Sequence, residues 1–445
     1  MRESQTGSSG LRPLMSRWVE PNRLLRPGAF AERRWGWREA AIALVLFAGP
    51  GWAFYRGVNP PRATYPAEHM PYSYPPMLIP FIPLALLVVG FIWVCLLSDT
   101  RLRLPASTAR VLSVVVFVQF VSFVLPGAYE FRHGSDNVEA LEVGASAILL
   151  FNDPYLFTTH YGNPIAPLLG GLLLVTPLLA LMHTLDLLNV IWLGGLAFLI
   201  DRRWGPWAAA SMLIYFTQLP WTRLSLPLAN DHAVAAAGVA LFGSWGFYLA
   251  TRDRPVHPLL RWFWACLFAC ALVYRLTMLV AVLPLAVLYI RRLGWQEARR
   301  WIVPSGLVSA LLLLVPLVVH PRAYLEGPIR MNLAKGASDS VPYSSLYVLL
   351  ATLVVLAVGA WFVRSLSSVW AVVAAALATM LLTVYGLRLF EMSPWEAFNR
   401  YETRWYPGWV FVFALASLLC PRTSRESAEP PAPAALSFSP SDDPQ

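Results

Sequence analysis

Long apolar runs dominate this chain from residue 40 to residue 420. Most are roughly 15–22 residues long, close to the ~20 residues that a helix needs to cross about 30 Å of hydrocarbon. Lipid cannot satisfy free backbone polar groups, so helix is the expected form of each run. The pattern predicts an all-α, polytopic membrane protein. The thirteen runs fall near 40–57, 77–97, 110–126, 163–183, 186–200, 206–221, 232–250, 259–275, 277–290, 302–320, 346–363, 367–388 and 407–420.

Arginines occupy the short segments between these runs. The net charge of +9 would be compatible with nucleic-acid binding if the basic residues formed one face. They instead form small clusters next to apolar runs, as in the positive-inside pattern of membrane proteins. We therefore expect no nucleic-acid partner, and we place the 98–110 loop and the 201–205 turn on the cytoplasmic side.

An even number of crossings must separate two cytoplasmic loops, yet three apolar runs lie between these two. We expect 163–183 not to cross, because it contains Pro167, Pro177 and the Gly170-Gly171 pair. It would lie in the interface or re-enter the membrane. About twelve transmembrane helices remain, with both termini cytoplasmic. The predicted regions are an Arg-rich arm (1–39), two additional helices (40–109), a transmembrane catalytic domain (110–420) and a disordered tail (421–445).

Carboxylates gather in the first large external loop, residues 127–185. Asp136, Glu139 and Glu142 follow one another at spacing i, i+3, i+6, at the start of an expected amphipathic helix. Charge is costly close to lipid, so such a cluster often marks chemistry. Two interpretations of Asp136 stay open: a helix cap favoured by the helix dipole, or a general base that takes a proton from an acceptor hydroxyl.

Further polar residues lie on the same side of the membrane. Asp153 precedes Pro154 and Tyr155, a sequence typical of a turn. Asp231 and His232 begin an apolar run, where they would act either as a helix cap or as a second acidic element facing the cavity. His160 is expected to be a polar loop residue, and no His, Asp and Glu set has the spacing of a metal site.

Arg275 interrupts the long apolar stretch 262–290 at a tight external turn. An arginine at membrane level either snorkels to the headgroups or faces a cavity or an anionic partner. Guanidinium matches phosphate oxygens bidentately, which makes a phosphate-binding role attractive. Arg322 and Arg330 add positive charge on the same side.

The sequence contains no P-loop, no GxGxxG after a strand and no GxSxG. The predicted cytoplasmic loops are also too short to house nucleotide chemistry. A substrate must therefore arrive through the membrane or on its outer face.

The chain resembles the membrane-embedded GT-C superfamily of glycosyltransferases. The resembling segments are Gly134-Ser-Asp136, Asp153-Pro-Tyr155 and Tyr161-Gly-Asn-Pro164, followed by Leu196 to Gly205 and Asp231. In that superfamily an acidic residue opens the first external loop, and an amphipathic juxtamembrane helix follows it. The resemblance covers roughly 110–290. Phe151 stands where that family usually has glycine, and two helices precede the first core helix.

The resemblance implies an inverting sugar transfer from a polyprenyl-phosphate donor, with bacterial mannosyl- and arabinosyltransferases as the nearest subfamilies. Asp136 would be the general base, and Arg275, with Arg322 or Arg330, would bind the donor phosphate. The acceptor would be a lipid, glycan or protein hydroxyl, reached on the periplasmic side of a bacterial inner membrane. No cofactor is expected, and a divalent metal is neither required nor ruled out. The expected cavity-lining residues are Glu139, Asp153, Tyr155, His160, Asp231 and His232.

Two other classes share this hydropathy. A secondary transporter or lipid flippase would also have about twelve spans, but it would carry charges at the bilayer midplane. Here the predicted spans are almost free of such charges. A non-catalytic scaffold or a polymer ligase is the remaining alternative.

Overall fold

The computed structural model describes residues 105–131, 136–160, 162–183, 185, 187–218, 232–252, 255–330, 341–392, 397 and 407–420. This described part is all-helical, and its only extended pairing is an isolated bridge between Thr158 and Pro164. The predicted runs 40–57 and 77–97, the arm 1–39 and the tail 421–445 lie outside these residues.

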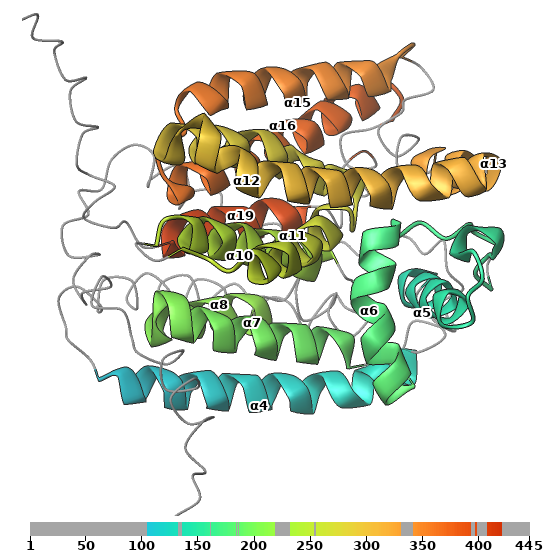
Figure 1. Ribbon diagram of the computed structural model, residues 1–445. Helices are drawn as coiled ribbons and strands as arrows, with labels where there is room; N and C mark the ends of the chain where they lie inside the picture. Colours follow the sequence, from blue (N-terminus) through green and yellow to red (C-terminus); the bar gives the residue numbers. More distant parts are fainter. Residues whose placement is uncertain are drawn as a thin grey trace, which may run out of the picture.

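Nine helices of the described part run side by side as an elongated bundle (Figure 1). Each coincides with a predicted apolar run or, for α12, with two of them. They are α4 (Ala106–Phe131), α7 (Leu188–Trp204), α8 (Pro206–Gln218), α10 (His232–Ala250), α11 (Pro258–Leu272), α12 (Val282–Val319), α15 (Ser344–Trp361), α16 (Leu366–Arg388) and α19 (Pro407–Leu419).

Two further helices lie across one end of the bundle. These are α5 (Asp136–Leu149) and α6 (Leu169–Met182). In Figure 1, α6 runs across the direction of the long helices, and α5 is seen almost end-on. The segment 163–183 therefore does not run with the other apolar helices, as its proline and glycine content suggested. The helix is nevertheless continuous through Pro177.

The chain reverses direction within α12, at Gly294. This residue has φ 74° and ψ 162°, a conformation essentially restricted to glycine. The rings of Tyr289 and Trp301 are 6.4 Å apart, whereas a straight helix would separate these positions by about 18 Å. The element is thus a hairpin of two helical arms, corresponding to the predicted runs 277–290 and 302–320.

Three helical stretches among the described residues are long and apolar enough to cross a membrane: Leu276–Val319, Ser344–Trp361 and Leu366–Arg388. The first of them contains the reversal at Gly294, so it supplies two arms. Shorter apolar helices are Ala106–Ser122, Leu169–Met182, Ala235–Ala250 and Pro258–Leu272. These apolar helices are compatible with a membrane protein, but the expected number of twelve spans is not confirmed.

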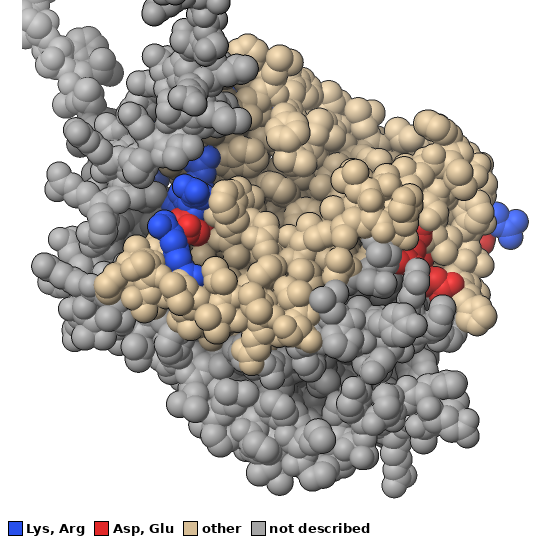
Figure 2. All heavy atoms as spheres, turned by 90° about the horizontal axis from the view of Figure 1, so that it is seen from below, with Lys and Arg blue, Asp and Glu red and all other residues tan. Residues whose placement is uncertain are grey.

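Among the described residues on the face seen in Figure 2, charged side chains lie at the two ends. One end carries basic residues around an acidic one, the other carries acidic residues and a basic side chain, and an uncharged band lies between them. The outer face of α4 contributes exposed valines to the apolar surface: Val111, Val114, Val115 and Val118. An apolar band between two charged ends matches the hydrocarbon core of a bilayer.

Aromatic side chains fill the centre of the bundle. Trp264 and Trp301 are almost fully buried, and their ring centroids lie 5.3 Å apart. The Trp264 indole N–H donates to the carbonyl of Phe242 at 2.7 Å, which satisfies its buried donor. A Cβ on Gly246 would lie only 2.1 Å from the Trp264 ring. Glycine is thus required where α10 meets this indole.

Candidate functional site

The candidate site lies at the end of the bundle that α5 and α6 cover. Four short elements join them there: η2 (Pro154–Leu156), η3 (Leu276–Ala281), α13 (Pro321–Tyr324) and the π-helical turn η4 (Leu325–Ile329). A separate apolar core holds these pieces together. It is built from residues of α5, α6, the connecting loop, the turn after α11, and α13, including Leu141, Ile165, Leu168, Leu172, Val273 and Tyr324.

Asp136 is the first residue of α5. That position suits either interpretation from the sequence, a dipole-favoured residue in the first turn or a carboxylate at the mouth of a site. Its side chain lies outside the described atoms. The backbone therefore places Asp136 at the covered end of the bundle.

The other two carboxylates of α5 accept backbone hydrogen bonds. Glu139 accepts from the N–H of His160. Glu142 accepts from the N–H of Leu185 at 3.1 Å. Each carboxylate thus holds α5 against a different part of the external loop, while the His160 side chain is exposed. These contacts give Glu139 and Glu142 a positioning role.

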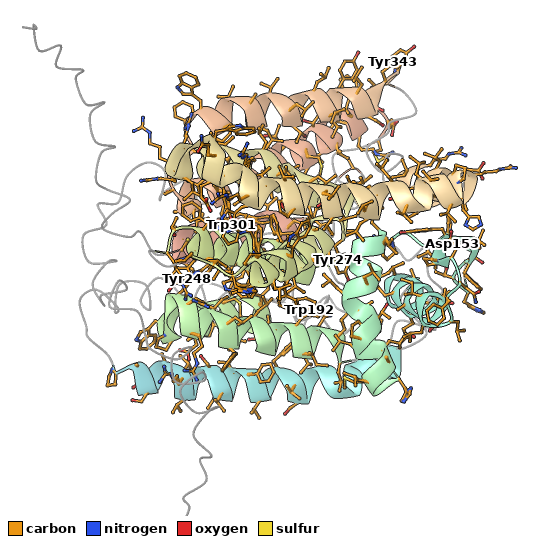
Figure 3. The ribbon with its side chains drawn as sticks, in the orientation of Figure 1. Asp153, Trp192, Tyr248, Tyr274, Trp301 and Tyr343 are labelled. Carbon is orange, nitrogen blue, oxygen red and sulfur yellow. The ribbon has the colours of Figure 1, made fainter. Side chains whose placement is uncertain are left out.

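Asp153 joins the loop to the far end of α12. One carboxylate oxygen accepts from the N–H of Tyr155 at 2.8 Å, which caps η2 and confirms the predicted turn. The other oxygen pairs with Nδ1 of His320. The Asp153 side chain is 12% exposed and that of His320 is 39% exposed. Figure 3 shows Asp153 at the covered end of the molecule.

Tyr155 is a buried residue of this loop. Its hydroxyl donates to the carbonyl of Pro167 at 3.3 Å, and its ring meets that of Tyr324 edge-on at 4.9 Å. Burial, followed by the charges of Tyr324 and Asp153, raises the pKa of Tyr155 well above 10. Burial also raises the pKa of Tyr324 to about 12. Both phenols stay neutral at physiological pH and pack the loop against α13.

Arg275 lies beneath this loop, at the start of η3, and is only 2% exposed. The loop contacts the turn that carries it: the N–H of Leu168 donates to the carbonyl of Tyr274 at 3.3 Å. A Cβ on Gly170 would lie 2.6 Å from the Cys270 carbonyl oxygen, so α6 touches the backbone of α11 directly. Burying a guanidinium is costly, so a buried arginine faces polar or anionic groups.

The remaining predicted site residues are either exposed at the surface or have side chains outside the described atoms. Arg322 is 89% exposed and pairs with Glu326 at 3.1 Å on α13. Arg330 is exposed at the end of η4. Both arginines are thus surface residues of the covered end, in contrast to the buried Arg275. Asp231 lies outside the described residues, and His232 begins α10 with a side chain that is not described.

The described residues contain no group of three His, Cys, Asp or Glu side chains arranged to hold a metal ion. The structure does add polar residues that the sequence did not single out. His320 ends an apolar run, and a His-Pro pair at that position is its only local signal. Arg388 and Glu391 form an ion pair at 3.1 Å at the end of α16, with side chains 13% and 10% exposed.

This end of the bundle brings together the carboxylate-bearing elements α5 and η2 and the turn that carries the buried Arg275. Such a site can hold an anionic group against Arg275 and activate a hydroxyl beside it. No family model, no curated protein and no solved structure matches this chain.

Proposed function

We propose that this protein is a membrane-embedded glycosyltransferase that uses a polyprenyl-phosphate sugar as donor. The observation that carries the proposal is Arg275, which is only 2% exposed and lies in a turn that the carboxylate-bearing external loop contacts. A lipid-linked phosphate approaches such a cation from the membrane, and a water-soluble acceptor approaches from outside.

In the proposed reaction, Asp136 accepts the proton of the acceptor hydroxyl. The acceptor oxygen then attacks the anomeric carbon, and the bond from that carbon to the phosphate oxygen breaks with inversion. The polyprenyl phosphate leaves with the bonding electrons, and Arg275 stabilises its added negative charge. Arg322 and Arg330 supply positive charge at the outer rim, where they attract the donor headgroup.

The loop residues divide by accessibility. Tyr155 is too buried to touch an acceptor, so its proposed contribution is to fix the loop. Glu139 and Asp153 use carboxylate oxygens for backbone contacts, and Asp153 also engages His320. The exposed His160 is the member of this set that we propose to meet an acceptor. His232, the first residue of α10, and Asp231, outside the described residues, are proposed to line the acceptor side.

We place this site on the periplasmic face of a bacterial inner membrane. The support is the opposite end of the bundle, where arginines concentrate around the reversal at Gly294 and the end of α7. By the positive-inside rule that end is cytoplasmic. The site would then face the outside, where polyprenyl-phosphate sugars are the activated donors compatible with the absence of a nucleotide-binding motif.

The test is sugar transfer by the purified protein in liposomes with a polyprenyl-phosphate mannose or arabinose donor. Asp136→Asn should lower turnover by about 10²–10⁴-fold, the usual contribution of a general base. Glu142→Gln is the matched control, because its amide oxygen can still accept from Leu185, and it should keep most of the activity. Undiminished turnover in Asp136→Asn would remove that residue as the base. Movement of intact donor across the bilayer without transfer would indicate a transporter instead.

A further inference from the structure

Two arginines contact a single tyrosine at the end of the bundle opposite the candidate site. Arg203 is in the last turn of α7, and Arg252 follows the end of α10. Their guanidinium carbons lie 4.8 Å and 4.7 Å from the ring centroid of Tyr248. Arg252 also donates to the Tyr248 hydroxyl at 3.4 Å. Figure 3 shows Tyr248 at the end away from Asp153.

The carboxylates described at this end are engaged elsewhere. Asp201 pairs with Arg110 at 3.3 Å. Glu297 pairs with Arg300 at 2.7 Å and with Arg261 at 3.9 Å.

Within the described part of the chain, neither Arg203 nor Arg252 has an ion pair with a carboxylate. Two like charges sharing one ring repel each other, and the ring offers each only a weak cation–π attraction. The pair therefore presents an excess of positive charge that an anion would neutralise. Asp253, the next residue after Arg252, lies outside the described residues.

Exposed aromatic side chains lie on the two helices that pack against α10, which carries Tyr248. On α7, Phe198 is 58% exposed, and its ring lies 5.2 Å from the guanidinium carbon of Arg202, the neighbour of Arg203. On α11, Trp262 is 45% exposed and Phe263 is 56% exposed, close to the start of the helix. A cationic pair at the helix ends and exposed aromatic rings on the neighbouring helices match the two parts of a phospholipid.

We propose that Arg203 and Arg252 bind the phosphate headgroup of an anionic membrane lipid, with Tyr248 holding both guanidinium groups in place. Guanidinium binds phosphate oxygens in paired, charge-assisted hydrogen bonds. Basic pockets between helix ends are a recurrent way for membrane proteins to hold anionic lipids. A zwitterionic lipid binds less well, because its choline cation faces the same arginines. This inference is independent of the proposed transferase activity.

The test is native mass spectrometry of the full chain released from a neutral detergent, titrated with phosphatidylglycerol or phosphatidylcholine. Wild type should bind the first phosphatidylglycerol at least tenfold more tightly than phosphatidylcholine. Arg203→Gln and Arg252→Gln should each weaken that first binding by about tenfold, the value expected for loss of one charge-assisted contact.

Arg300→Gln is the matched control, since Arg300 is at the same end, is exposed and already pairs with Glu297. It should leave the first phosphatidylglycerol affinity within about twofold of wild type, because a surface charge of this kind contributes little. An equal loss of phosphatidylglycerol affinity in all three variants would mean a diffuse effect of charge and would contradict the proposed site. Unchanged binding in Arg203→Gln and Arg252→Gln would do the same.

Two further measurements complete the experiment. Inorganic phosphate at millimolar concentration should not displace the lipid, and full displacement would assign the site to free phosphate instead. Arg203→Lys keeps the charge but loses the paired donors, so it should retain more affinity than Arg203→Gln. If Arg203→Gln does not fold, Arg203→Lys and Arg252→Gln still decide the question, because an unchanged preference for phosphatidylglycerol in both would contradict it.

Discussion

Replacing Gly170 with alanine tests how the loop is fixed over Arg275. The new Cβ would lie 2.6 Å from the carbonyl oxygen of Cys270 and 2.9 Å from that of Val273. Even close C–H···O contacts are about 3.3–3.6 Å long. Both obstacles are backbone atoms, so no side-chain rotation relieves the overlap. The start of α6 must move away from the end of α11.

The energetic cost follows from this geometry. Forcing an extra methyl into a packed contact costs about 1–3 kcal/mol. Alanine recovers up to about 1 kcal/mol of helix propensity, and less at Gly170, because it is the second residue of α6. Displacing α6 also stretches the hydrogen bond from Leu168 to Tyr274. We expect a net loss of about 1–2 kcal/mol of unfolding free energy.

The assay is equilibrium unfolding in mixed micelles with increasing SDS, followed by tryptophan fluorescence. Gly195→Ala is the control: Gly195 is in α7, is exposed, and a Cβ added to it would have no heavy atom within 4 Å. It should be neutral or up to about 1 kcal/mol stabilising. If Gly170→Ala unfolds at the same SDS fraction as Gly195→Ala, the direct backbone contact between α6 and α11 is wrong.

Three further outcomes are expected. A double-mutant cycle with Asp153→Asn and His320→Ala, read by the same unfolding assay, should give a coupling of about 1 kcal/mol; additive effects would contradict the pair. The folded protein keeps Tyr324 protonated up to a pKa of about 12, whereas the unfolded chain loses this proton near pH 10. Stability is therefore lost as pH rises from about 10 to 12, by up to about 1.4 kcal/mol per pH unit; Tyr324→Phe should flatten that slope, and an identical slope would disprove the assignment. Gly294→Ala should cost about 1–3 kcal/mol through backbone strain alone, because nothing lies within 4 Å of its Cβ position; wild-type stability would rule out the reversal there.

Hydropathy predicted most of the helical layout. The runs 346–363 and 367–388 correspond to α15 and α16 within two residues at each end. These boundaries are predictable because a long apolar helix is specified by its own residues. The prolines and glycines of 163–183 also distinguished this segment from the other helices, although the glycines serve close packing and do not break the helix.

The site was less predictable for a physical reason. Asp153 and His320 are 167 positions apart, and no periodicity or spacing links them. The burial of Arg275 likewise depends on α6 folding back over its turn. Glu139 and Glu142 were recognised as a cluster, but their backbone partners are set by the path of the loop. Local patterns identify charged residues near a membrane end, whereas their partners depend on tertiary contacts.

Because of the hairpin at Gly294, the second arm of α12 connects the opposite end of the bundle to the candidate site. Beside the reversal, Arg291 donates to the carbonyls of Trp361 and Val363, and Arg292 donates to that of Arg364. These bonds come from the end of the first arm and anchor the reversal, where the second arm begins, to the connection between α15 and α16. The second arm then extends about 37 Å at 1.5 Å per residue. His320 at its far end pairs with Asp153. A tilt of about 5° at the anchored base would displace the tip by roughly 3 Å, enough to release the external loop without unfolding any helix.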